Sequence, residues 1–197
     1  MFELLLPLTL FAIAGTVTPG PNNVMLTASG SAFGFRRTLP HMLGITIGFP
    51  IMVFAVGLGL GEMFTRYPSL HLALKYIGAA YLLYLAWRIA QASGPENGEA
   101  SGRPLTFLEA AGFQWVNPKA WMLAVSSIPA FTTVGGNYYA ELAVIGAVYA
   151  AICFPSCAAW CMFGVAIRRL VSSPGAARVV NLLLAAAVAA SVVLLFI

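Results

Sequence analysis

The chain has 197 residues, of which 60% are hydrophobic and only 8% are charged. Soluble domains carry about 25% charged residues, so this composition excludes a domain whose surface is covered by water. It predicts an all-α integral membrane protein. The net charge of +4 does not indicate nucleic-acid binding, because the basic residues lie mostly in short segments between apolar runs.

Six apolar runs are long enough to cross a bilayer, which requires about 20 residues. They cover residues 4–30, 40–63, 70–92, 106–131, 138–166 and 177–197. The segment 93–104, SGPENGEASGRP, is the longest and most polar separator and divides the chain near its middle. We therefore expect a first three-helix repeat over 1–92, a cytoplasmic linker over 93–105 and a second three-helix repeat over 106–197.

The basic residues predict how these runs are oriented. Alternate connections contain Arg36, Arg37, Arg88, Arg103, Arg168, Arg169 and Arg178. The other connections contain only Arg66 and, nearby, Lys75. The positive-inside rule places the arginine-rich connections in the cytoplasm and both termini in the periplasm. Because each half has an odd number of helices, the halves are expected to form an inverted repeat, as in many secondary transporters.

The first run is interrupted by the sequence TVTPGPNN at 16–23. Thr18 precedes a proline, which disfavours helical geometry there, and Pro19 lacks a backbone N–H. Gly20 adopts unusual dihedral angles easily, and Pro21 suits the first position of a new helix. The apolar segment before the break rises about 21 Å at 1.5 Å per residue, so the break is expected deep in the bilayer. Such a break is tolerated only against protein or a water-filled cavity.

The second half contains a matching interruption at 113–122, FQWVNPKAWM. Asn117 is a favoured N-cap and Pro118 a favoured first helical residue. This break lies about 18 Å from the start of its run at 1.5 Å per residue. Corresponding breaks in the two halves indicate a transporter binding site.

The chemistry of the two breaks predicts an anionic ligand. Two helix N-termini directed into the membrane favour negative charge, and Lys119 adds a full positive charge at a depth where charge is costly. A solute with a carboxylate suits these groups, and Asn22, Asn23 and Asn117 could pair with its polar remainder. An alternative for Lys119 is that it extends to the interface or pairs with a backbone carbonyl.

Four motifs resemble the lysine exporter / homoserine-threonine efflux superfamily of amino-acid exporters. They are TPGPNN at 18–23, GFRRTLPHMLGITIG at 34–48, LKYIGAAYLLYLAWR at 74–88 and NPKAW at 117–121. The resemblance implies a six-helix carrier of the bacterial inner membrane, not an enzyme, that expels amino acids using the proton gradient. It also implies that the two signature breaks consist of Pro19, Gly20, Pro21, Asn117, Pro118 and Lys119. Protons and an amino acid are the implied partners, and no cofactor is expected.

Three further features leave alternatives open. His41 is a candidate for proton coupling, because its charge changes near neutral pH, or it is an interfacial residue beside Pro40. Gly44 and Gly48 allow close helix packing within the chain or in a homodimer.

The third feature is a row of cysteines, Cys153, Cys157 and Cys161, which share one face of the fifth run. They indicate core packing or, alternatively, a soft-metal site suited to cadmium-like cation efflux. Thiol–disulfide electron transfer would require a cysteine in each break, and neither break contains one.

Overall fold

The computed structural model describes residues 2–60, 66–91, 102–171 and 173–196. Every regular element in these segments is helical, which confirms the prediction of an all-α protein. By length and composition, four helical segments are able to cross a membrane: Pro21–Leu60, Leu72–Ala90, Tyr138–Leu170 and Gly175–Leu195. The arrangement as six spans in an inverted repeat stays a prediction, and most of the expected linker (92–101) lies outside the described residues.

Two groups of helices follow one another along the chain. The first consists of α1 (Phe2–Val17), α2 (Pro21–Ala55), the π-helical turn η1 (Val56–Leu60) and α4 (Pro68–Ala90). The second consists of α5 (Phe107–Phe113), η2 (Gln114–Val116), α6 (Pro118–Phe131), α7 (Tyr138–Leu170), α8 (Pro174–Ala190) and η3 (Val193–Leu195). Described helices therefore lie within each of the six apolar runs.

The boundary predicted between the first two runs is wrong in detail. The segment 34–40 was expected to separate two helices, but α2 continues on both sides of Gly34, and that residue alone has non-helical dihedral angles (φ 78°, ψ 172°). Glycine reaches positive φ without the steric cost that a Cβ imposes. A single residue therefore reverses the chain, and Arg36, Arg37 and Pro40 belong to the helix that follows.

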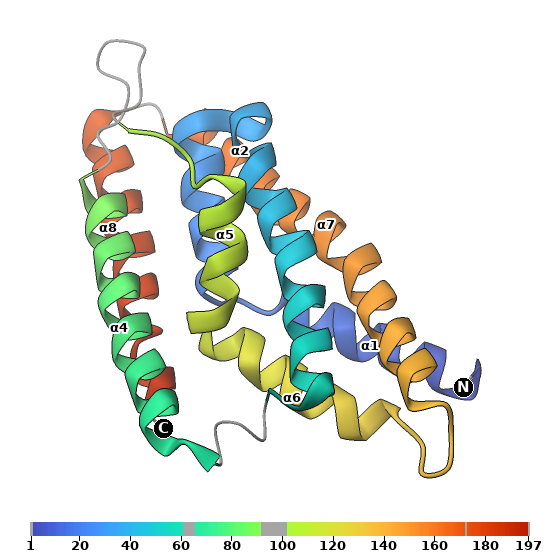
Figure 1. Cartoon of the computed structure of the whole chain (residues 1–197). Helices are drawn as coiled ribbons and strands as arrows, with labels where there is room; N and C mark the ends of the chain where they lie inside the picture. The colour runs from blue at the N-terminus through green and yellow to red at the C-terminus, as the bar shows by residue number, and fades with distance from the viewer. Residues whose placement is uncertain (1, 61–65, 92–101, 172, 197) are drawn as a thin grey trace.

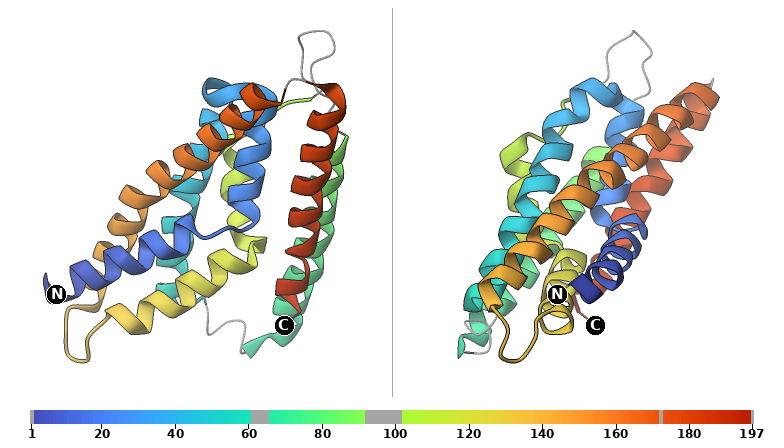
Figure 2. Two further views of the ribbon diagram at one scale, coloured as in Figure 1. Left: turned by 180° about the vertical axis from the view of Figure 1, so that it is seen from behind. Right: turned by 90° about the vertical axis from the view of Figure 1, so that its right-hand side faces the viewer.

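Two of the connections lie at the opposite end of the molecule from the termini (Figure 1). The turn of α2 at Gly34 and the junction between α7 and α8 lie at the upper end, whereas both termini lie in the lower part of the view. The helices α4 and α8 run side by side, and α1 and α6 extend obliquely away from them in both views of Figure 2. The arginine-rich segments that the structure describes thus gather at one end.

The contact between α2 and α7 depends on two glycines. A Cβ added to Gly30 would overlap the carbonyl oxygen of Cys161, and one added to Gly164 would overlap the carbonyl oxygen of Thr27. Glycine is therefore required on each helix for the backbones to approach so closely. Gly44 and Gly48 pack in the same way against α5, where a Cβ at Gly48 would lie 2.7 Å from the Cα of Ala111. Of the two alternatives for these glycines, the structure shows packing within the chain.

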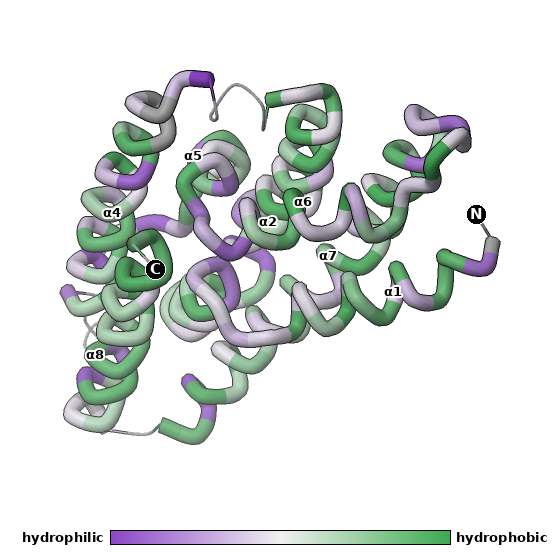
Figure 3. Tube along the Cα trace, turned by 90° about the horizontal axis from the view of Figure 1, so that it is seen from below, coloured by the Kyte–Doolittle hydropathy of each residue, from purple (hydrophilic) through white to green (hydrophobic). Residues whose placement is uncertain are grey.

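Buried side chains form two hydrophobic clusters, which we call the upper and the lower core. The upper core includes Leu26, Met42, Leu82, Phe113 and Val188. The lower core includes Leu8, Met52, Val53, Ala124 and Tyr149. Figure 3 shows hydrophilic segments near the centre of the bundle, around α2, α5 and α6. The polar residues of the candidate site lie between these cores.

The glycine contacts lead to a first prediction. Gly30→Ala and Gly164→Ala should each lower the stability of the purified protein by about 1–3 kcal/mol, the usual cost of overpacking. Thermal unfolding in detergent measures this loss. Gly112→Ala is the matched control, because no heavy atom lies within 4 Å of the added Cβ. Equal melting temperatures for all three variants would contradict the tight α2–α7 contact.

Candidate functional site

The two predicted breaks lie against each other. The helix α1 ends at Val17 and α2 begins at Pro21, with Gly20 as an extended N-cap. The helix α6 begins at Pro118. A Cβ on Gly20 would lie 2.7 Å from the Cδ of Lys119. Segments about a hundred positions apart in the sequence therefore form one site.

The ammonium group of Lys119 binds the backbone of the first break. Its Nζ donates a hydrogen bond to the carbonyl oxygen of Thr18 and a longer one, 3.5 Å, to that of Pro19. These carbonyls follow the C-terminus of α1, where the helix dipole favours a cation. The structure thus shows the carbonyl-pairing alternative for Lys119, and this pairing joins the two halves of the chain.

Two more side chains bind carbonyls at the end of α1. The amide of Asn23 donates to the carbonyl oxygens of Thr16 (2.7 Å) and Thr18 (2.9 Å). The hydroxyl of Ser156, on α7, donates to Thr16 at 3.0 Å. Together with Lys119, these donors satisfy backbone acceptors that the helix break leaves without intrahelical partners.

A pair of amide side chains forms a second link between the halves. The Nδ2 of Asn22 donates to the Oε1 of Gln114 at 2.9 Å, and the Nε2 of Gln114 donates to the Oδ1 of Asn22 at 3.3 Å. Gln114 is fully buried and was not identified from the sequence. The available signal was a glutamine three residues before the Asn117 N-cap, inside an apolar run.

A cavity of about 50 Å³ lies between the two breaks. The predicted residues that line it are Gly20, Asn22, Asn23, Asn117 and Lys119, and they are joined by Thr16, Gln114, Ser156 and apolar side chains. Thr18, Pro19, Pro21 and Pro118 do not line it, and Thr18 and Pro19 are exposed. We call this space the central cavity.

The central cavity separates the two cores. Along α2, Ile45 belongs to the upper core and Phe49 to the lower core, and both line the cavity. Along α7, Cys157 belongs to the upper core and Cys153 to the lower core, and both line the cavity. The polar site therefore lies across the middle of the bundle, where each long helix passes from one core to the other.

The local charges and dipoles suit an anion. The side chain of Asn117 caps α6 by accepting a hydrogen bond from the backbone N–H of Lys119 at 3.1 Å. Gly20 offers no side-chain cap to α2, so the first-turn amides of α2 are left to solvent or a ligand. Amides at a helix N-terminus with an ammonium group beside them are typical of sites that bind carboxylates.

His41 lies outside the central cavity. Its side chain is 1% exposed, so the interfacial alternative is wrong. It lines a separate cavity of about 220 Å³, and neither ring nitrogen has a hydrogen-bond partner among the described residues. Its role in proton coupling stays a prediction.

The cysteine row is buried on α7, and all three thiols are free. Cys153 and Cys157 line the central cavity, whereas Cys161 packs in the upper core. Within the described segments, no group of three or more His, Cys, Asp or Glu side chains is placed to hold a metal ion. The row was expected to pack in the core, and two of its members also face the candidate site.

Apolar helices that are interrupted at two facing breaks, around a cavity lined by both polar and apolar side chains, are typical of membrane carriers. The chain matches the family model of the LysE type translocator over residues 13–197. It therefore belongs to the LysE type translocator family, a family of multi-pass membrane transport proteins.

Curated relatives support this assignment. A cysteine/O-acetylserine efflux protein from Klebsiella pneumoniae is 32% identical over 179 residues, which cover 89% of this chain and 88% of the relative. A protein of the same name from Escherichia coli is 28% identical over 176 residues and covers 89% and 88%. One from Salmonella typhimurium is 30% identical over 122 residues and covers 61% and 62%. No solved structure matches the chain.

The carbonyl contacts lead to a second prediction. Asn23→Ala removes two hydrogen bonds, to the carbonyl oxygens of Thr16 and Thr18, and should destabilise the protein by about 1–3 kcal/mol, since each bond contributes about 1 kcal/mol. Ser156→Ala should cost less, since it removes only one hydrogen bond, to Thr16. Thermal unfolding in detergent gives the order. A larger loss for Ser156→Ala than for Asn23→Ala would contradict this account.

Proposed function

We propose that this protein is a secondary active exporter that moves small amino acids out of the bacterial cytoplasm across the inner membrane. The proposed solutes are cysteine, O-acetylserine or similar zwitterions, and the proton gradient drives their export. One observation carries the proposal: the only lysine at the breaks, Lys119, is held by backbone carbonyls beside a central cavity. A solute carboxylate would displace these carbonyls from the ammonium group of Lys119.

The size of the central cavity indicates how binding and movement are coupled. A cavity needs about 10–15 Å³ to hold one water molecule, so a cavity of about 50 Å³ has room for a few water molecules and is too small for an amino acid. The solute carboxylate would attract Lys119 away from Thr18 and Pro19, which removes the contact that Lys119 makes between the end of α1 and α6. The two breaks then separate and enlarge the cavity, so that solute binding loosens the link between the halves.

The proposal includes the predicted architecture and site. Six spans in two inverted three-helix repeats would move against each other around the breaks. The termini would lie in the periplasm. The solute would contact the two segments of the predicted site, Thr18, Pro19, Gly20, Pro21, Asn22 and Asn23, and Asn117, Pro118 and Lys119. Gln114 joins them because it pairs with Asn22.

The names of the relatives favour amino acids over the alternative of cadmium-like cation efflux. A cationic centre at Lys119 also repels a metal ion, since like charges cost energy in a poorly solvated site. We therefore carry the amino-acid hypothesis alone.

Transport by the purified protein tests this function. In proteoliposomes with an imposed pH gradient, the wild-type protein should transport O-acetyl-L-serine or L-cysteine. Lys119→Met should reduce the maximal rate at least tenfold, because the carboxylate loses its ionic partner. Radiolabelled solute flux measures the rate.

Lys75→Met is the matched control, because Lys75 is the only other lysine in the chain and lies on α4 without lining the central cavity. It should transport at the wild-type rate. Export by Lys119→Met at the wild-type rate would remove the central role of Lys119. Failure of the wild-type protein to transport any amino acid would overturn the proposed function.

Thiol labelling tests the position of the solute. A variant that carries Cys153→Ala and Cys161→Ala keeps only Cys157, which lines the central cavity. A small methanethiosulfonate should label it more slowly when O-acetyl-L-serine is present, because solute and reagent compete for the same space. A variant that keeps only Cys161 is the control, since Cys161 does not line the cavity. Equal labelling of the Cys157 variant with and without solute would place the solute elsewhere.

A further inference from the structure

A second cavity, of about 220 Å³, lies at the arginine-rich end of the bundle. Its walls are formed by both arms of α2, the end of α4, the segment 102–105 and one residue of α8. The polar groups that line it are Ser29, His41, Arg88, Gln91, Arg103 and Asn181. We call it the arginine-side cavity.

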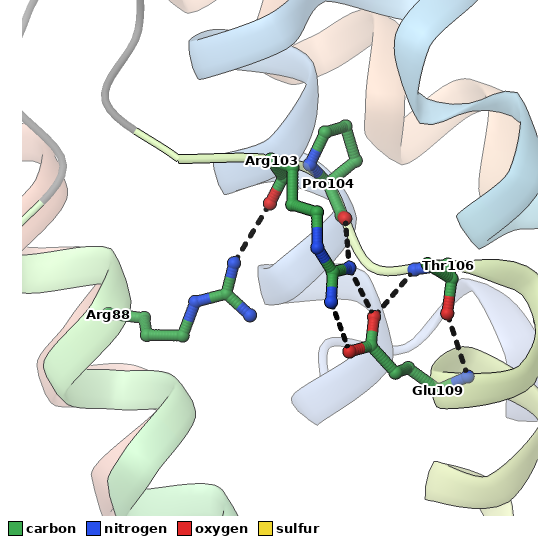
Figure 4. Close-up of polar contacts among 5 residues, drawn as sticks. All are labelled: Arg88, Arg103, Pro104, Thr106 and Glu109. Carbon is green, nitrogen blue, oxygen red and sulfur yellow. Dashed lines mark hydrogen bonds and ion pairs between the residues drawn. The ribbon is translucent and has the colours of Figure 1, made fainter.

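The two arginines of this cavity differ in their partners. Arg103 forms a two-pronged ion pair with Glu109, with both N···O distances at 2.6 Å (Figure 4). Glu109 also accepts a hydrogen bond from the backbone N–H of Thr106 at 2.8 Å. Arg88 donates to the carbonyl oxygen of Arg103 at 2.9 Å, and within the described segments no carboxylate pairs with it. Among the described residues, the positive charge of Arg88 is therefore not neutralised by a carboxylate.

His41 supplies a second unsatisfied group. It is 1% exposed, and both ring nitrogens lack a partner within the part of the chain that the structure describes. Buried polar groups are nearly always hydrogen-bonded, so this ring requires a partner from the cavity. A neutral imidazole has one N–H donor and one acceptor nitrogen. The acceptor suits an ammonium group, whereas the charge of Arg88 suits a carboxylate.

The arginine-side cavity lies one or two helical turns from the central cavity. Asn23 lines the central cavity and Ser29 the arginine-side cavity, about 9 Å apart at 1.5 Å per residue. On the other arm of α2, Ile45 lines the central cavity and His41 the arginine-side cavity, about 6 Å apart at 1.5 Å per residue. The same two helical arms thus line both cavities in succession.

From these observations we propose that the arginine-side cavity is an intake site for the exported amino acid. It binds the carboxylate at Arg88 and the ammonium group at His41, before the solute moves along α2 to Lys119. This inference rests on the proposed function. Drug-sized molecules occupy pockets of about 300–1,000 Å³. A single amino acid is smaller than these molecules, so a cavity of about 220 Å³ suits it.

An anionic lipid offers the same oxyanion chemistry to Arg88 through its phosphate. We favour the free zwitterion because it satisfies the buried acceptor nitrogen of His41 as well as the guanidinium. The experiment below distinguishes the two sources by changing the lipid.

Transport kinetics in proteoliposomes of phosphatidylcholine test the intake site. Arg88→Gln should raise the half-saturating concentration of O-acetyl-L-serine about tenfold, because a charge-assisted hydrogen bond is lost, and should affect the maximal rate less. Arg88→Lys should restore part of the affinity, since it keeps the charge. Arg36→Gln is the matched control, because it removes an exposed arginine at the same end of the molecule, and this arginine lines neither cavity. It should leave the half-saturating concentration unchanged.

Direct binding supplies a readout that does not depend on transport. In equilibrium dialysis with detergent-purified protein, Lys119→Met should keep weak binding of O-acetyl-L-serine. Adding Arg88→Gln or His41→Phe to Lys119→Met should remove it. Correct folding of each variant is checked by its elution as a single species in size-exclusion chromatography.

Each outcome has a distinct meaning. Wild-type transport together with an unchanged half-saturating concentration for Arg88→Gln would overturn the intake site and leave the proposed function standing. An effect of Arg88→Gln seen only when phosphatidylglycerol is added would assign the cavity to a lipid headgroup and also overturn it. Absence of both wild-type transport and wild-type binding would overturn the function and, with it, this inference.

Discussion

The structure depends on how the carbonyl groups at the broken end of α1 are satisfied. A helix that stops inside a membrane leaves acceptors that lipid cannot bind, and each unsatisfied group costs several kcal/mol. Here the acceptors of Thr16, Thr18 and Pro19 receive hydrogen bonds from side chains of α2, α6 and α7. Three helices are therefore held at one point by the requirement to satisfy one break.

The hydrogen bonds to these carbonyls differ in kind, so that, under the proposed function, some hold the end of α1 while one is exchanged for a solute. The donors Asn23 and Ser156 are neutral and short, so they hold the end of α1 in place. Lys119 is different, because its ammonium group binds a carboxylate more strongly than a neutral carbonyl. A solute anion can therefore compete for this one contact while the neutral hydrogen bonds remain. The break and the proposed binding site share the same lysine.

The close packing of α2 and α7 gives this centre its frame. Gly30 and Gly164 let the two longest helices touch backbone to backbone on one side of the central cavity. Both helices continue from the upper to the lower core, and both line the cavity where the cores meet. Packing in lipid gains little from the hydrophobic effect, so such close contacts carry much of the association between helices.

The sequence alone determined the helical class, the two breaks and the residues that begin the new helices. These features follow from local chemistry: proline removes a donor, asparagine caps, and long apolar runs require lipid. The sequence did not place the turn at Gly34. The residues RRTLP at 36–40 have the composition of a loop, but in the structure they are helical. Nor did the sequence identify Gln114, whose role depends on a partner 92 positions away.

Only the tertiary structure decided what Lys119 binds and where His41 lies. From the sequence, the ammonium group of a lysine beside a break has either a ligand or a backbone carbonyl as its partner. Which of these it binds depends on where the fold places Thr18, about a hundred residues earlier. His41 follows a proline at a predicted helix end, which is typical of an interface. The fold instead buries it beside a cavity that α4 and α8 also line, because Gly34 turns the chain earlier than expected and carries the histidine inside. Local propensity fixes where helices begin and end, whereas the partners of buried polar groups are set by contacts between distant segments.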